Sequence, residues 1–432
     1  MNETQGVIRA KNAKNNFGRT GWLIIFLGMF MYFCSAGVIV EGSNMLVPAF
    51  AAEHSVSEAG LYASATVASL LGIPLSIVAG VFLTKWGPRK MMALWWGLGA
   101  VGLVITGLSR SVVGYCIGRI FVTMASTGGI TVSFNGLVTN WFPTKKDMIQ
   151  GWATIGSNLS TAFAVIIIGL LIATVTINGT YFVCAGAFLL VAILSLFFRD
   201  NPEDVGQLPD NDRNMTREKA LDLLRKGEEY QKNSPWTAKK LLKTKQVWQI
   251  AIGYGIVMLI TVGILSTFVP TLMIKGLELN SAISMMTVAA VVAMPCSYLW
   301  GYLGSKLSTK KASLLLYVVV IICIAFILVP TKWSAYISVV LLGCFIGAGN
   351  NLLPSIVASV FGRYDFSRAM TVIIPIWSIV FAFATTVVGV PQSLTGSYVL
   401  SYIILLVLAV VGLILVKTLD DRCIGRMDLE DT

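Results

Sequence analysis

Two ionisable side chains lie deep inside long apolar segments, where they are well placed to do chemistry. Glu41 lies about six residues before the end of the apolar run 21–47, and Arg119 about six residues after the start of the run 112–141, so at 1.5 Å per residue both are roughly 9 Å below the same membrane surface. Charged groups are costly in hydrocarbon and usually face a cavity or a partner. A carboxyl group there can carry a proton, and a guanidinium can bind a carboxylate through two hydrogen bonds.

The elements that position these residues are predicted to be membrane helices. The chain is 56% hydrophobic and 12% charged, whereas soluble proteins have about 25% charged residues. Runs of about 20 apolar residues can span a bilayer. Twelve such runs predict an all-α membrane protein with twelve transmembrane helices: 21–47, 58–84, 91–109, 112–141, 150–174, 177–198, 247–273, 281–304, 312–329, 334–361, 369–391 and 396–417.

A short basic sequence that occurs twice divides these helices into two halves. Gly80-Val-Phe-Leu-Thr-Lys-Trp-Gly-Pro-Arg-Lys90 returns as Gly301-Tyr-Leu-Gly-Ser-Lys-Leu-Ser-Thr-Lys-Lys311. A repeat at half the chain length predicts two pseudo-symmetric six-helix bundles, as in secondary transporters. The predicted organisation is a tail (1–20), an N-terminal bundle (21–198), a linker (199–246), a C-terminal bundle (247–417) and a tail (418–432). We expect the linker to be a solvated connection, with a helix over 216–232 and a basic amphipathic segment over 236–245.

The distribution of cations predicts the orientation. With both termini in the cytoplasm, 28 of the 32 Lys and Arg residues lie on the cytoplasmic side; the exceptions are Arg110, Lys275, Lys332 and the intramembrane Arg119. This asymmetry follows the positive-inside rule. The net charge of +11 therefore reflects topology and attraction to anionic lipid rather than nucleic-acid binding. We expect a multi-pass protein of the cell membrane, in particular a bacterial inner membrane.

The doubled sequence resembles the loop motif of the major facilitator superfamily, Gly-x-x-x-Asp-Arg-x-Gly-Arg-Arg, and the whole chain is similar to that family. The resemblance implies a gate at the cytoplasmic side. The candidate gate residues of the two copies are Gly80, Thr84, Lys85, Gly87, Arg89 and Lys90, and Gly301, Ser305, Lys306, Lys310 and Lys311. The family's aspartate, which helps to latch that side shut, is Thr84 in one copy and Ser305 in the other. We expect a weaker latch, because a hydroxyl cannot form an ion pair.

Two stretches resemble an organic-anion branch of the family, the oxalate–formate antiporter-like group. They are Trp86-Gly-Pro-Arg-Lys90 and Asn201-Pro-Glu-Asp-Val-Gly206. The helix-5 antiporter motif is absent from 151–171, which argues against drug–proton exchange. The runs 281–304 and 369–391 contain no Lys or Arg, so the cations that oxalate carriers use are missing.

The resemblance also places helices 1 and 4 side by side at a central cavity and matches Arg119 to a helix-4 arginine linked to proton coupling. We therefore expect Glu41 and Arg119 to pair when Glu41 is ionised. Protonation of Glu41 would free Arg119 to bind a substrate carboxylate, which links proton and anion binding. The alternatives are a permanent structural bridge between helices 1 and 4, or a Glu41 that faces the outer vestibule.

Helical spacing extends the candidate substrate site to further residues. A single cation with aromatic walls favours a monoanion with an apolar body over a dianion. The candidate substrate-binding residues are Arg119, Phe30, Asn44, Tyr115, Thr123, Tyr254, Met258, Thr261, Asn350, Asn351 and Trp377.

The function that follows is secondary active transport by alternating access, most simply proton-coupled uptake of a small organic monocarboxylate by a monomer. Efflux of an amphipathic metabolite or drug and a transporter-like sensor are the alternatives. The sequence has no phosphate-cradling loop, zinc-ligand spacing or nucleophile elbow, so we predict neither an enzyme nor a cofactor or metal site.

Overall fold

The first half of the chain forms an N-bundle of α-helices interrupted by two π-helical segments. The computed structural model describes residues 17–212, 216–348 and 351–424, and these contain no β-strand. The elements of the N-bundle are α2 (Gly18–Ala36), η1 (Gly37–Glu41), α3 (Ser43–His54), α4 (Glu58–Leu108), α5 (Val112–Met124), η2 (Ala125–Phe134), α6 (Asn135–Trp141), α7 (Lys146–Ala153) and α8 (Ile155–Ser195).

The second half forms a C-bundle, which a structured linker joins to the N-bundle. The linker contains η3 (Pro202–Val205), η4 (Pro209–Asn211), α9 (Arg217–Lys232) and α10 (Ala238–Lys243). The C-bundle consists of α11 (Lys245–Ile274), α12 (Leu279–Leu307), α13 (Thr309–Leu328), α14 (Lys332–Ile346), α15 (Leu352–Ala382), α16 (Ala384–Thr395) and α17 (Val399–Lys417).

Backbone kinks convert the longest helices into pairs of spans. Gly87 in α4, Thr176 in α8 and Gly362 in α15 have φ values of 78°, 66° and 70°, which no α-helix contains. Each lies in a gap between two predicted apolar runs. Three other spans are each broken into several elements: α2–η1–α3, α5–η2–α6, and α14 with the start of α15. When these are each counted as one span and the kinked helices as two, the described residues form the predicted twelve spans. Nine helical stretches in the described part of the chain are long and apolar enough to cross a membrane, among them Val112–Trp141, which runs through α5, η2 and α6.

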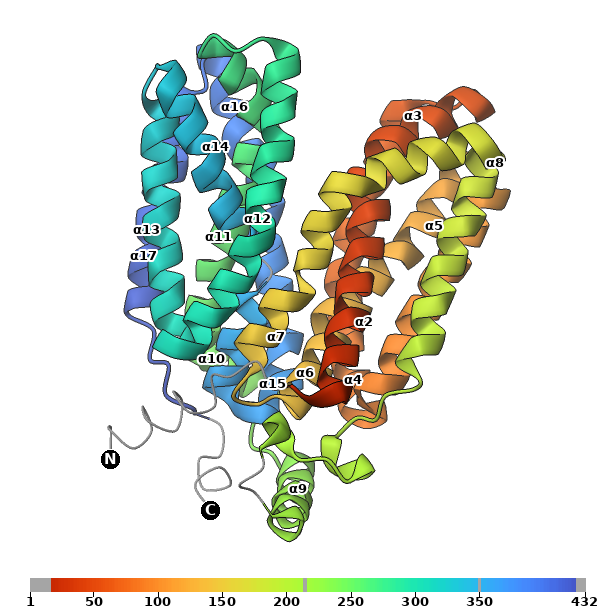
Figure 1. Ribbon diagram of the computed structural model, residues 1–432, viewed down its shortest axis with the longest axis vertical. Helices are drawn as coiled ribbons and strands as arrows, with labels where there is room; N and C mark the ends of the chain where they lie inside the picture. The colour runs from red at the N-terminus through yellow and green to blue at the C-terminus, as the bar shows by residue number, and fades with distance from the viewer. Residues whose placement is uncertain (1–16, 213–215, 349–350, 425–432) are drawn as a thin grey trace.

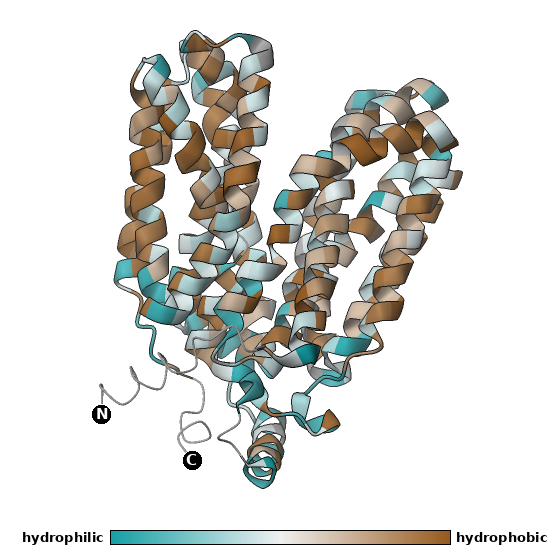
Figure 2. Ribbon diagram, in the orientation of Figure 1, coloured by the Kyte–Doolittle hydropathy of each residue, from teal (hydrophilic) through white to brown (hydrophobic). Residues whose placement is uncertain are grey.

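Each bundle has its own apolar core and an apolar outer surface. Ile24, Trp96 and Phe134 are fully buried in the N-bundle, and Phe268 and Phe345 in the C-bundle. Large apolar side chains are exposed along the length of both bundles, and Figure 2 shows hydrophobic residues throughout the helices of both. Such a surface is stable only against hydrocarbon, so the outer faces are lipid-facing.

The two bundles converge at the end where the linker lies and diverge toward the opposite end (Figure 1). We call these the linker end and the distal end. At the linker end α7 and α8 pack on α12, and α4 packs on α15. The linker is only in part the solvated connection that its polarity predicted: many of its described residues are exposed, but Glu203, Ala220 and Tyr230 are at least nine-tenths buried. The helix predicted over 216–232 is present as α9, which begins with a Thr216 cap.

Candidate functional site

Arg119 connects the fourth span to the first. Its helix, α5, begins at a Ser111 cap whose side chain accepts a hydrogen bond from the Gly114 backbone. Arg119 Nη1 donates to Ser43 Oγ at 3.0 Å and Nη2 donates to the Ile39 carbonyl oxygen at 2.8 Å. Both acceptors are neutral, and the side chain is only partly buried. Among the described residues Arg119 has no ion-pair partner, so its charge is uncompensated.

Glu41 does not form the predicted ion pair with Arg119. Its carboxylate instead accepts a hydrogen bond of 2.8 Å from Thr161 Oγ1 of α8. The predicted direction of the side chain was therefore wrong. Ile39 and Ser43, four residues apart, share one face of the first span, and Glu41 is two residues from each. Two helical steps of about 100° place it on the opposite face.

The two spans that carry these residues both contain π-helical segments. In the first span the Gly42 backbone donates to the Gly37 carbonyl oxygen at 2.8 Å, one residue beyond the α-helical partner. A Cβ at Gly42 would lie 2.3 Å from that oxygen and 2.4 Å from Ile168 Cδ1, so only glycine fits. The second segment, η2, follows α5 in the fourth span. Single-turn π segments often mark functional sites in helices.

Three predicted substrate-binding residues are buried inside their own bundles and do not line a shared site. Tyr115 is 3% exposed and packs against Phe50, and Tyr254 is 3% exposed with its hydroxyl bonded to Ser313. Thr261 donates to its own helix at the Val257 carbonyl oxygen. Spacing placed these residues on a helical stripe but could not show which stripe faces the other bundle.

The other predicted substrate residues are only partly buried or fall outside the description. Phe30, Met258 and Trp377 are partly buried. The Trp377 ring stacks on Phe381, and its Nε1 donates to the Tyr254 carbonyl oxygen at 3.2 Å. Thr123 donates to the Arg119 carbonyl oxygen within its helix. The Asn44 side chain and Asn350 lie outside the described residues.

Asn351 lies at a polar junction between the two bundles. It is fully buried, and its side chain bonds to Thr154 of the N-bundle and donates to the Ser297 carbonyl oxygen at 2.9 Å. Asn158 of α8 donates to Ser297 Oγ at 2.8 Å. Because the Thr154–Asn351 and Asn158–Ser297 bonds cross from one bundle to the other, Asn351 here helps to join the bundles.

In the first copy of the repeated loop, a linker carboxylate lies beside the loop. Gly87 has a φ of 78°, and a Cβ there would lie 2.4 Å from Asp200 Oδ2. The Arg89 backbone N–H donates to Asp200 Oδ1 at 2.7 Å. Lys85 and Lys90 are exposed; for Gly80 and Thr84 only the helical backbone is described.

In the second copy, a carboxylate of the N-bundle has the corresponding position. A Cβ at Gly301 would lie 2.4 Å from the Asp147 carbonyl oxygen, and one at Gly304 would lie 3.0 Å from the Asp147 carboxyl carbon. Thr309 Oγ1 donates to the Asp147 carboxylate at 3.1 Å. Both loops therefore have a carboxylate nearby although each lacks the motif's own aspartate.

The remaining gate residues of the second copy make local contacts. Ser305 Oγ donates to the Tyr302 carbonyl oxygen at 2.9 Å, and the Lys306 ammonium lies 4.8 Å from the Tyr302 ring centre. Lys310 Nζ donates to the Leu419 carbonyl oxygen at 2.6 Å, whereas Lys311 is exposed.

A buried ion pair joins the linker to the C-bundle. Arg363 of α15 donates to both carboxylate oxygens of Glu203 at 3.0 and 3.1 Å, and to Asn201 Oδ1 at 3.1 Å. The two charged side chains are 9% and 1% exposed. This two-pronged geometry is the strong form of an ion pair. Nothing in the sequence pattern indicated it, since the partners are far apart and neither belongs to a periodic stripe.

A second set of contacts fixes α9 against the same helix. Asp365 accepts hydrogen bonds from Tyr230 Oη at 2.7 Å and Ser234 Oγ at 2.6 Å. Arg368 donates to the Gln231 carbonyl oxygen at 2.6 Å. The linker therefore holds α15 at several points.

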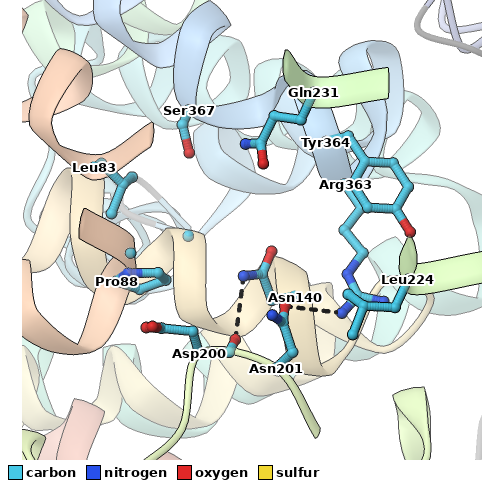
Figure 3. Close-up of a pocket in the computed structure, with 12 residues that line it drawn as sticks. Leu83, Pro88, Asn140, Asp200, Asn201, Leu224, Gln231, Arg363, Tyr364 and Ser367 are labelled. Carbon is cyan, nitrogen blue, oxygen red and sulfur yellow. Dashed lines mark hydrogen bonds between the residues drawn. The ribbon is translucent and has the colours of Figure 1, made fainter. Parts of the chain in front are cut away.

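A cavity of about 160 Å³ lies where the N-bundle, the linker and the C-bundle meet. In Figure 3 the side chains of Asn140, Gln231 and Ser367 point toward its centre, one from each of the three parts. Asn140 also donates to the Asp200 carbonyl oxygen at 3.2 Å. All three parts thus meet around this polar space.

Burial also shifts the titration of the linker carboxylates. Desolvation raises the pKa of Asp210, although hydrogen bonds from the Thr144 and Lys145 backbone N–H groups oppose the rise. Desolvation raises the pKa of Asp200 for the same reason, against the hydrogen bond from Arg89. Docking of the linker is therefore coupled to protonation.

Comparisons with solved structures show which fold this is. The proton:xylose symporter XylE, bound to 6-bromo-6-deoxy-D-glucose, has a TM-score of 0.73 at 12% identity, over 95% of this chain and 98% of that one. The human organic anion transporter MFSD10 has a TM-score of 0.68 at 14% identity, over 91% and 98%. FucP in its outward conformation has a TM-score of 0.67 at 13% identity, over 94% and 100%.

Sequence comparison identifies the family. The nitrate/nitrite transporter NrtP of a Picosynechococcus species is 30% identical over 108 residues, and the match spans 24% of this chain and only 20% of that protein. The family profile described as Major Facilitator Superfamily matches residues 22–385. Since this match covers most of the chain and the fold is that of transporters of this kind, the chain belongs to the major facilitator superfamily.

Proposed function

We propose that this transporter takes up a small organic monocarboxylate together with a proton, by alternating access. The observation that carries the proposal is the uncompensated charge of Arg119. A partly buried guanidinium that contacts only a hydroxyl and a backbone carbonyl is poorly stabilised in a membrane interior. An incoming carboxylate would supply the missing negative charge.

The hydrogen-bonding capacity of Arg119 supports an anion with a planar acceptor. A guanidinium has five N–H donors, and two of them donate to Ser43 and Ile39. Carboxylates use two parallel N–H groups at once. One cation favours a single negative charge. The structural neighbour MFSD10 is an organic anion transporter, which agrees with this class.

Glu41 is the proposed proton carrier, acting through the first span rather than through a direct pair. Arg119 binds the span at Ile39 and Ser43, and Glu41 lies between them and contacts Thr161. An anion that draws Arg119 away would remove its hydrogen bonds to Ile39 and Ser43 on one face of this π-helical turn. Protonation of Glu41 would weaken the contact with Thr161 on the opposite face. We propose that each event favours the other, and linkage makes this coupling reciprocal.

The linker end is proposed to be cytoplasmic, because most cations of the chain lie there. With the bundles joined at that end and diverging at the other, the structure corresponds to an outward-facing state, the conformation in which its structural neighbour FucP was solved. Uptake would then begin from this state. A bacterial inner membrane and a monomer remain part of the proposal.

Counterflow and uphill uptake in proteoliposomes test the proposal, with a panel of monocarboxylates at two pH values. Arg119→Gln should raise KM at least about 30-fold, since losing one partner of a buried charge pair costs about 2–5 kcal/mol. Glu41→Gln should abolish uphill uptake and spare counterflow. Arg110→Gln is the control, because Arg110 is exposed. An unchanged KM in Arg119→Gln would overturn the anion site, and uphill uptake in Glu41→Gln would overturn the proton site.

An inorganic oxyanion is a second candidate, favoured by the partial match to the nitrate/nitrite transporter. Nitrate also presents planar oxygen acceptors to a guanidinium. Including nitrate in the same counterflow panel separates the two: exchange with nitrate but with no carboxylate would select this alternative.

A further inference from the structure

Two cysteines of the C-bundle lie close enough to react with each other. Cys296 of α12 and Cys344 of α14 have their sulfur atoms 3.5 Å apart. Both are free thiols. A disulfide bond is about 2.05 Å long, so the sulfur atoms would have to approach by roughly 1.5 Å.

Close helix packing holds the pair in register. A Cβ at Gly343 would lie 2.5 Å from the Ala289 carbonyl oxygen, and one at Gly347 would lie 2.7 Å from the Ala293 carbonyl oxygen. These glycines let α14 approach the α12 backbone next to Cys296. On the other side, Trp300 Nε1 donates to the Cys344 carbonyl oxygen at 2.7 Å. The thiols therefore face each other because both backbones are fixed.

We propose that Cys296 and Cys344 form an oxidisable dithiol, which a peroxide that reaches the protein in the membrane converts to a disulfide. One thiol, as its thiolate, attacks an oxygen of hydrogen peroxide, and the O–O bond breaks. The sulfur becomes a sulfenic acid, and the hydroxide that leaves takes up the proton of the thiol to form water. The second sulfur then attacks the sulfenic sulfur and releases another water. Two thiols and one hydrogen peroxide give one disulfide and two waters.

The neighbouring residue connects this reaction to the junction between the bundles. Ser297 directly follows Cys296 and receives hydrogen bonds from Asn158 of the N-bundle and from Asn351. Closing the disulfide shifts the α12 backbone at Cys296, and we expect this shift to disturb the adjacent hydrogen bond between Ser297 and Asn158. Oxidation is therefore expected to weaken one of the contacts between the bundles at the linker end. This consequence rests only on the two-bundle architecture and not on the proposed substrate.

The test uses the full-length protein in proteoliposomes, treated with hydrogen peroxide and then alkylated with N-ethylmaleimide after denaturation. The number of alkylated thiols should fall from seven to five, and peptide mass spectrometry should find Cys296 joined to Cys344. Cys296→Ser should not form the link, whereas Cys184→Ser, with a buried thiol in the other bundle, should form it. Recovery of Cys296 and Cys344 as separately alkylated peptides in the wild type, or a link from either to Cys323, would overturn the proposal.

A distance measurement tests the consequence without a substrate. Spectroscopic labels on noncanonical residues at Val113 and Leu394, exposed positions at the distal ends of the two bundles, report their separation. Peroxide should raise the population with the shorter distance, a dithiol reductant should reverse the change, and Cys296→Ser should not respond. A link that forms without any change in the distances would refute the step through Ser297.

Discussion

Breaking the ion pair between Glu203 and Arg363 should open the linker end. Glu203→Gln keeps the shape of the side chain but replaces one acceptor oxygen by an NH₂ group that faces the guanidinium. The charges are 1% and 9% exposed, so water cannot replace the lost partner. Removing one member of a buried pair costs about 3–5 kcal/mol. At about 1.4 kcal/mol per factor of ten, the closed state should lose at least about 100-fold in relative population.

The labels at Val113 and Leu394 measure this shift, because the distal ends approach as the linker end opens. Asp222→Asn is the matched control on the same linker: its pair with Lys226 has a similar length of 2.7 Å but side chains that are 46% and 49% exposed. Such surface pairs contribute about 0–1 kcal/mol. The double variant Glu203→Gln with Arg363→Gln should recover part of the loss. An unchanged distance distribution in folded Glu203→Gln would refute the reasoning.

Three further predictions concern the same end of the molecule. Gly301→Ala should inhibit transport and favour the open linker end, because its Cβ would lie 2.4 Å from a backbone oxygen, whereas Gly97→Ala, with nothing within 4 Å, should leave transport rates unchanged. Asn351→Ala should lower the unfolding temperature in a thermal scan, since it leaves buried partners unsatisfied at a cost of about 1–3 kcal/mol. The raised pKa of Asp210 means that the docked linker binds its proton more tightly than the undocked one; docking should therefore strengthen as the pH falls from neutral toward about 4 and weaken as it rises. The mobility of a spin label at the exposed Val205 should follow this change, and equal mobility at both pH values would contradict it.

The spans could be predicted from the sequence because hydropathy and length decide them. Gly87, Thr176 and Gly362 all fall in the short gaps between predicted runs, and each proved to be a kink. The direction in which a side chain points from its helix was harder to predict. Rise per residue assigns Glu41 and Arg119 a similar depth, but the rotation of Glu41 away from Arg119 depends on two helical steps and on a π-helical turn that composition does not reveal.

Contacts between distant segments could not be predicted from one sequence. Glu203 and Arg363 lie in polar stretches that fit a solvated surface equally well, and only the docking of the linker on α15 brings them together. Comparison with the family motif predicted that the two loops lack a carboxylate, because Thr84 and Ser305 replace the aspartate of the motif. It could not show that Asp200 and Asp147 lie beside the same loops, because that depends on position in space rather than in sequence.

The positions of Asp147 and Asp200 limit how the two halves of the protein can be exchanged with those of a relative. Asp147 belongs to the N-bundle but lies against the loop of the C-bundle, and Asp200 reaches the first loop from the linker. Neither loop is therefore completed by the bundle to which it belongs alone. A hybrid that joined this C-bundle to the N-bundle of a relative would close properly only if that relative placed an acid at the same point. Recombination between related transporters should therefore preserve Asp147 and the second loop as one inherited set.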